Sequence, residues 1–169
     1  MWKNTPLWWA VSNGHADVVE MLLGVDDINP DKGNRFGQTP LWCAASRGHL
    51  RVVKILLRRS DVNINEPSLS GKTPLACAAQ GGHEDVAKML LERGEINPDK
   101  PSREGLTPLA YAARAGHEGV VKMLLGRSDV NPKSPDINGR TPLWWASLRG
   151  HAGVVALLEP AESTTPNTT

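Results

Sequence analysis

The 169-residue sequence is poor in aromatic residues, in net charge and in long apolar runs. No stretch of about 20 apolar residues is present to span a bilayer. The segment after Met1, WKNTPLWWA, lacks the basic start and the small-residue cleavage site of a signal peptide. A formal net charge of +1 argues against a nucleic-acid binder that works mainly by phosphate neutralisation. These absences predict a soluble intracellular, cytoplasmic protein without a membrane or nucleic-acid partner.

Two short motifs recur along the chain every 34 residues. Thr-Pro-Leu begins at Thr5, Thr39, Thr73, Thr107 and Thr141, and Gly-His begins at Gly14, Gly48, Gly82, Gly116 and Gly150. Fixed periods of about 20 to 50 residues are typical of solenoids, in which each unit buries its apolar face against its neighbours. The sequence therefore predicts one repetitive domain.

Each unit carries the signals of two short helices. Thr39 can cap a helix N-terminus with its hydroxyl, and Pro40 fits the first helical position. Gly48 can end that helix in the left-handed conformation. The next segment, HLRVVKILLRR, has apolar residues at helical spacing and predicts a second helix. Stretches such as DVNINEPSLSGK, rich in Asn, Pro, Ser, Asp and Gly, predict extended turns or hairpins between units, which we call fingers.

The repeated segment at 71–97, GKTPLACAAQGGHEDVAKMLLERGEIN, resembles the ankyrin repeat. That motif runs G-x-T-P-L-H-x-A-A-x-x-G-H, then V-V-x-x-L-L, then D-V-N. The resemblance implies an all-α solenoid of five stacked antiparallel helix pairs over residues 1–159, with units of about 1–36, 37–70, 71–104, 105–138 and 139–159. Residues 160–169, rich in Ser, Thr and Pro, are expected to form a disordered tail. The Trp-rich 34-residue units are similar to ankyrin repeats of filamentous-fungal multidomain proteins.

The Trp-Trp pairs of the first and last units should divide their roles, because successive helical residues point about 100° apart. We expect Trp8, Trp42 and Trp144 to pack toward the following unit. By the resemblance, the first helices line a concave groove, so the next position should form an exposed file of Trp9, Cys43, Cys77, Tyr111 and Trp145. The alternative is that a Trp in this file lies flat across its own repeat and only stabilises it.

The candidate partner-binding residues lie in this groove and on the first finger. Trp, Tyr and Arg are the residue types that dominate the binding energy of protein interfaces. The candidates are Trp9, Arg47, Tyr111, Arg114, Trp145 and Arg149 in the groove, with Arg35 and Phe36 on the finger.

The five histidines suggest a metal or catalytic site at first sight, but each begins a second helix, where it can bond local backbone groups. Stacked helices lie about 8–10 Å apart, whereas zinc needs histidine nitrogens about 2.0–2.1 Å from the ion. No catalytic constellation is identifiable in the sequence. We therefore predict a non-enzymatic protein with no metal and no cofactor.

Cys43 and Cys77 occupy equivalent positions in adjacent units. The helix spacing of about 8–10 Å exceeds the roughly 7 Å that a disulfide can bridge. Both cysteines should therefore be free thiols, which suits a reducing compartment.

Together these features predict a protein–protein interaction module that presents a rigid groove and variable finger residues to a protein partner, as a monomer when isolated. The alternative function is a structural spacer or sensor arm of a larger signalling protein, with no ligand of its own. Exposure of Trp9, Tyr111 and Trp145 would favour the first function. Their burial against the stack would favour the second.

Overall fold

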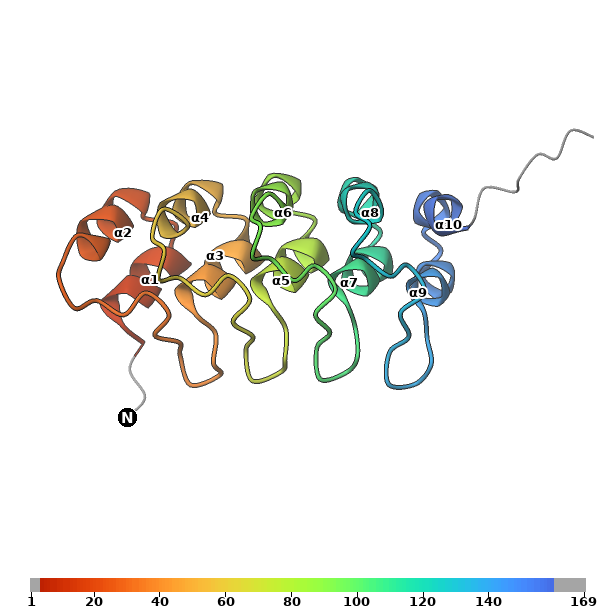
Figure 1. Cartoon of the computed structure of the whole chain (residues 1–169), viewed down its shortest axis with the longest axis horizontal. Helices are drawn as coiled ribbons and strands as arrows, with labels where there is room; N and C mark the ends of the chain where they lie inside the picture. Colours follow the sequence, from red (N-terminus) through yellow and green to blue (C-terminus); the bar gives the residue numbers. More distant parts are fainter. Residues whose placement is uncertain (1–3, 160–169) are drawn as a thin grey trace, which may run out of the picture.

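The computed structural model describes residues 4–159, and in that range it contains ten α-helices and no strands. The helices form consecutive pairs arranged in a row, which gives the molecule an elongated shape (Figure 1). The all-α solenoid of five stacked helix pairs is confirmed. The expected disordered tail at 160–169 lies outside the described residues.

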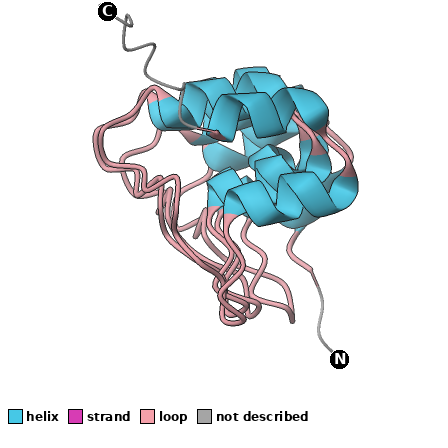
Figure 2. Ribbon diagram, turned by 90° about the vertical axis from the view of Figure 1, so that its right-hand side faces the viewer, coloured by secondary structure: helices cyan, strands magenta, loops and turns pink. Residues whose placement is uncertain are grey.

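The helices form two layers that run along the row (Figures 1 and 2). The first helix of each pair lies in the layer next to the fingers: α1 (Pro6–Ser12), α3 (Pro40–Arg47), α5 (Pro74–Gly81), α7 (Pro108–Ala115) and α9 (Pro142–Arg149). The second helices form the other layer: α2 (Ala16–Leu23), α4 (Leu50–Leu56), α6 (Glu84–Leu91), α8 (Glu118–Leu125) and α10 (Ala152–Leu158). Viewed along the row, all fingers project from the first-helix layer in the same direction (Figure 2).

The predicted signals set the ends of the first helices. The hydroxyl of Thr39 accepts a hydrogen bond of 3.1 Å from the backbone N–H of Trp42, and the other four threonines of the motif make the same bond. Pro40 follows as the first helical residue. Gly48 ends α3 with φ 70°, which is costly for residues with a side chain. Every first helix therefore has the same start.

One apolar core runs along the whole stack between the two layers. Leu41, Leu75 and Leu109 occupy the same repeat position and are fully buried. Alanines at 44–45, 78–79 and 112–113 are also fully buried, and their small side chains let neighbouring first helices approach closely. Each pair thus covers the apolar face of the next, as expected for a solenoid.

The histidine that recurs in every unit forms the joint between successive pairs. The Nε2 atom of His83 lies 3.2 Å from the carbonyl oxygen of Ser46 in the preceding unit, and His49, His117 and His151 repeat this contact at 3.0–3.4 Å. Because a carbonyl oxygen only accepts, Nε2 carries the proton in these bonds. The expectation that these rings bond local backbone was wrong, since their partner lies in the preceding unit.

The fingers are narrow turns that are hydrogen-bonded to one another. In the second finger, the N–H of Ser68 donates to the carbonyl of Lys72 at 3.0 Å. Neighbouring fingers are joined by three backbone bonds, from Leu69 to Phe36, from Arg103 to Ser70 and from Ile137 to Glu104, at 2.8–3.1 Å. The four fingers therefore form one linked row.

We expect the Leu90→Ala substitution to lower the free energy of unfolding by about 2–5 kcal/mol, because it removes a fully buried side chain from a central unit. Leu22→Ala, at the equivalent position in the first unit, should have a smaller effect because Leu22 is only partly buried. Urea denaturation of both variants measures the difference. Equal losses would contradict stabilisation by neighbouring units.

A pair of glycine substitutions tests the histidine joint. Gly82 and Gly150 both have positive φ, 67° and 71°, so alanine is strained at either position. A Cβ at Gly82 would lie 2.5 Å from Nδ1 of His117, whereas a Cβ at Gly150 would have no neighbour within 4 Å. Gly82→Ala should therefore destabilise the array by about 1–3 kcal/mol more than Gly150→Ala, in the range of overpacked sites. Thermal unfolding of the two variants provides the comparison, and equal shifts would show that the ring does not fill this space.

Candidate partner-binding surface

The predicted file of exposed groove residues is exposed only at its first position. The Trp9 side chain is 57% exposed, but Tyr111 and Trp145 are only 3% and 7% exposed. The prediction of an exposed Tyr111 and Trp145 was wrong because their own finger bonds them. The Tyr111 hydroxyl donates to the Ser102 hydroxyl at 3.1 Å, and the Trp145 indole N–H donates to the Asp136 carboxylate at 3.2 Å.

The two cysteines of the file are likewise buried and unpaired, so the free thiols are confirmed and their expected exposure was wrong. Burial raises the pKa of both thiols above its ordinary value, despite the opposing influence of nearby Arg47 on Cys43 and Lys72 on Cys77. The file therefore contributes mainly to the interior of the array.

The tryptophans predicted to pack toward the next unit do so in the first two units. The indole N–H of Trp8 donates to the carbonyl of Gln38 at 3.1 Å, and that of Trp42 donates to the carbonyl of Lys72 at 2.9 Å. Trp144 departs from this pattern and is exposed. Within residues 4–159, no following unit supplies a carbonyl for its indole. Its ring packs edge-on against Trp145, as the Trp8 ring does against Trp9.

Cationic side chains surround the buried aromatic rings of the last units. We call this group the cation–aromatic cluster: Lys72, Tyr111, Arg114, Arg140, Trp144 and Trp145. The Arg114 guanidinium lies 5.3 Å from the Tyr111 ring centre and 5.2 Å from that of Trp145. The Lys72 ammonium lies 4.5 Å from the Tyr111 ring centre, within the range of cation–π attraction. The structure thus brings together three of the predicted site residues, Tyr111, Arg114 and Trp145.

Arg140 completes the cluster through a buried acid that our sequence analysis did not single out. Its guanidinium lies 4.3 Å from the Trp145 ring centre and pairs with the Asp136 carboxylate at 2.8 Å. Burial by itself raises the pKa of Asp136, but hydrogen bonds from the backbone N–H groups of Arg140 and Asn138, together with the Arg140 guanidinium, outweigh it. The pKa of Asp136 therefore lies below its ordinary value. The sequence does contain a signal for this ion pair. In the turn segment DINGR, the acid Asp136 stands four residues before the cation Arg140.

The ends of the fingers carry exposed apolar side chains. We define the finger ends as residues 35–36, 69–70, 103–104 and 137–138. Phe36 and Leu69 are 50% and 55% exposed, and Ile137 is also exposed. Arg35 lies over the Phe36 ring, 4.5 Å from its centre. Phe36 and Leu69 line a shallow hollow of about 330 Å³ together with Gln38, Ser68 and Ser70.

Arg47 and Arg149 occupy the same repeat position, at the C-terminal ends of α3 and α9, and both are exposed. In the described part of the chain, neither makes a cation–π contact with the rings of the cluster. The structure therefore divides the predicted site residues into three groups. Arg35 and Phe36 belong to the finger ends, and Tyr111, Arg114 and Trp145 belong to the cluster. Trp9, Arg47 and Arg149 are exposed and lie outside both.

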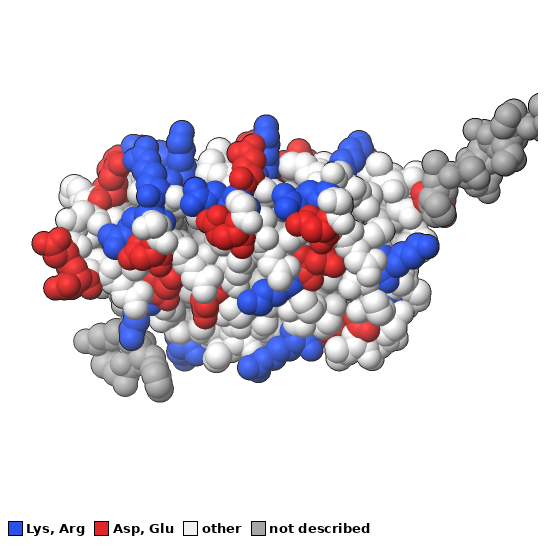
Figure 3. Space-filling view, in the orientation of Figure 1, with Lys and Arg blue, Asp and Glu red and all other residues white. Residues whose placement is uncertain are grey.

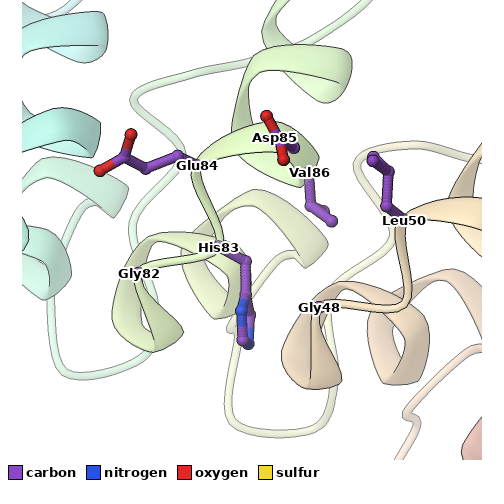
Figure 4. A pocket seen from close by; sticks show the side chains of 7 residues that line it. All are labelled: Gly48, Leu50, Gly82, His83, Glu84, Asp85 and Val86. Carbon is purple, nitrogen blue, oxygen red and sulfur yellow. The ribbon is translucent and has the colours of Figure 1, made fainter.

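A second hollow, of about 340 Å³, lies between the helix turns of the second and third units (Figure 4). Its lining residues are Gly48, Leu50, Gly82, His83, Glu84, Asp85 and Val86. The His83 ring points toward Gly48, and Glu84 points away from Leu50, toward the neighbouring unit (Figure 4). The Nε2 of His83 is already bonded to Ser46, so this hollow belongs to the joint between units.

Within residues 4–159, no group of three His, Cys, Asp or Glu side chains is placed to bind a metal ion. No helix in the same range combines the length and the apolar character needed to cross a membrane.

A family model described as ankyrin repeats, three copies, matches the chain over residues 7–102 and 95–168. The chain therefore belongs to the ankyrin-repeat family. Members of this family are generally protein–protein interaction modules and are typically non-catalytic. A comparison with the curated proteins gives no match.

The Asp136 ion pair should make part of the stability of the array dependent on pH. Because the pKa of Asp136 is lowered in the folded chain, its contribution is fully present above the unfolded pKa of about 3.9 and disappears as the pH falls through the lower folded pKa. We expect Asp136→Asn to be less stable than the native array near neutral pH, with a difference that shrinks below about pH 4. Urea unfolding of both proteins across this range measures it. A difference that stays constant with pH would contradict the ion pair.

Proposed function

We propose that the array is a non-enzymatic protein-interaction module that contacts a protein partner through the finger ends and the adjoining surface of the first helices. The observation that carries this proposal is the exposure of Phe36 and Leu69 on the neighbouring first and second finger ends, with a further exposed apolar side chain, Ile137, on the fourth. Exposed apolar side chains gathered on one surface are typical of protein interfaces.

Rigid support of these side chains favours the same function. Backbone bonds of 2.8–3.1 Å join each finger to the next, and the first helices below them are anchored by the buried core. Side chains on such a support lose little freedom when a partner binds, which lowers the entropic cost of association. The finger ends differ from unit to unit, so they offer a partner a specific pattern on a uniform framework.

The predicted site residues have different roles in this proposal. Arg35, Phe36, Arg47 and Arg149 are exposed and available for direct contact, and Trp9 is available at the α1 end of the row. Arg114 is half-buried between two rings and presents its guanidinium from there. Tyr111 and Trp145 support Arg114 from below.

The burial of Tyr111 and Trp145 also favours a second candidate function, a structural spacer or sensor arm of a larger signalling protein. In that case the cluster would serve only to stabilise the last units. The two functions differ in whether altering exposed finger-end residues changes any interaction of an intact array.

The reduced, buried state of Cys43 and Cys77 supports an intracellular location. Disulfides form mainly in oxidising compartments, and these two cysteines do not form one. We propose that the array works inside the cell, in the cytoplasm.

The proposed interface is tested by affinity capture from a cell extract with the native array and with a Phe36→Ser/Leu69→Ser double variant. We expect the double variant to lose the captured proteins, since truncating a central interface residue typically weakens binding by about 2 kcal/mol or more. Its stability should change little, by about 0.5 kcal/mol per exposed site.

The matched control is Met21→Ser/Val25→Ser, which removes apolar side chains of comparable exposure, 70% and 55%, from the second-helix side of the first unit. This control should capture the same proteins as the native array. Loss of partners with the control and retention with the finger variant would place the interface on the other side. Identical sets from all three arrays would favour the spacer function.

A further inference from the structure

Charge is divided unequally between the two helix layers. The first helices contain three arginines, Arg47, Arg114 and Arg149, and no acidic residue. The second helices carry acidic and basic residues together. Red and blue atoms accordingly alternate over the second-helix side of the molecule (Figure 3). A nearly neutral protein therefore has one layer whose charged groups are all positive.

The fingers add two cations next to this layer. Lys72 and Arg140 occupy the same repeat position, immediately before the threonine that caps α5 or α9. Lys72 also donates to the Gln80 side chain at 2.5 Å, so it reaches across to the surface of α5. We define the inner face by these five cations: Arg47, Lys72, Arg114, Arg140 and Arg149.

Most of these cations have no carboxylate partner in the described chain. Arg140 pairs with Asp136, but no acid lies within ion-pair distance of Arg47, Lys72, Arg114 or Arg149 in residues 4–159. On the other layer, Arg51, Arg58 and Lys122 each pair with a carboxylate. Lys54 and Lys88 of that layer are unpaired within the described chain, but they share it with the acidic residues of α2, α6 and α8, whereas the first helices contain no acid. The helix layer of the inner face therefore carries net positive charge.

Two of these charges contact the same aromatic ring of the cluster. Lys72 and Arg114 lie over the same Tyr111 ring, at 4.5 and 5.3 Å from its centre. Each of these cations attracts the carboxylate of a ligand, because neither is neutralised by an acid of the described chain. Because the buried rings fix both cations, a carboxylate ligand meets a preformed site.

We infer that the inner face binds a partner through an extended acidic segment, whose carboxylates pair with Lys72, Arg114, Arg47 and Arg149. This inference rests on the proposed function and specifies its partner. Neighbouring helices in a stack lie about 8–10 Å apart, and an extended chain advances about 3.3–3.6 Å per residue. Acidic residues at every third position of the segment therefore match cations on successive units.

The burial of the aromatic rings favours an acidic peptide over single-stranded nucleic acid. Nucleic-acid grooves combine positive charge with exposed aromatic faces on which bases stack. Here Tyr111 and Trp145 are buried, and cations already cover them. The rings beside Lys72 and Arg114 therefore offer charge pairing but little stacking surface, whereas Trp9 and Trp144 are exposed, which makes an oligonucleotide the necessary comparison ligand.

The test uses a labelled peptide of about 12 residues with Glu at every third position, separated by Ser and Gly. A peptide with Gln in place of Glu and a thymidine oligonucleotide of similar length are the comparison ligands. Fluorescence anisotropy with the full chain measures binding at about 50 and 500 mM salt. We expect the Glu peptide to bind at low salt, to bind at least roughly 10-fold more tightly than the Gln peptide, and to dissociate at high salt.

Three inner-face variants locate the binding site. Lys72→Gln/Arg114→Gln should weaken binding of the Glu peptide by roughly 10-fold, and Lys72→Arg/Arg114→Lys should retain it because both charges remain. Arg47→Gln/Arg149→Gln, which alters only exposed residues, should also weaken binding without unfolding the array. The matched control, Lys54→Gln/Lys88→Gln, removes the same charge from the second helices and should bind normally.

Three outcomes would overturn the inference. They are equal binding of the Glu and Gln peptides or no binding of either, equal weakening by the Lys54/Lys88 control, and tighter binding of the oligonucleotide than of the Glu peptide. If partners captured from an extract still depend on Phe36 and Leu69 in any of these cases, the interaction function stands and only the acidic segment is rejected.

Discussion

The contact between a histidine ring and the glycine of the preceding unit is the interaction on which the rest of this structure depends. The glycine has a positive φ and no Cβ, so the His83 ring can sit against Gly48 while its Nε2 bonds the carbonyl of Ser46. This one contact sets the distance and the angle between neighbouring pairs. The common apolar core and the linked row of fingers both require that setting, since each is assembled from one contribution per unit.

The division of labour between the two layers follows from this stacking. Several residues that face the neighbouring units are constant, such as the leucine of the Thr-Pro-Leu motif and the Gly-His pair, because each must fit a neighbouring copy. The fingers and the outer ends of the first helices escape this requirement, and there the units differ most. Phe36, Leu69, Arg103 and Ile137 stand at neighbouring finger ends with different chemistry. Specificity is thus confined to positions where change does not disturb stacking.

The helices, their caps and the stacking order could be predicted from the sequence because each depends on local signals repeated in register. Thr39, Pro40 and Gly48 specify the same helix in any unit, and their roles are as predicted. The burial of Tyr111 and Trp145 could not be predicted from a helical wheel. It depends on a finger that returns over its own helix and offers Ser102 or Asp136 as a partner. The histidine bonds were misjudged for the same reason, since their partners lie about one repeat away in the sequence.

The last described unit retains the glycine site against which, in earlier units, the histidine of the next unit packs. Gly150 has the same positive φ as Gly48, but a Cβ there would meet nothing within 4 Å, and the hollow beside it measures about 400 Å³. The geometry of each joint is thus indifferent to the total number of units. A further block of 34 residues can therefore stack through the same kind of joint that connects the existing units. The length of the recognition surface is therefore free to evolve in whole steps, independently of the chemistry displayed on each finger.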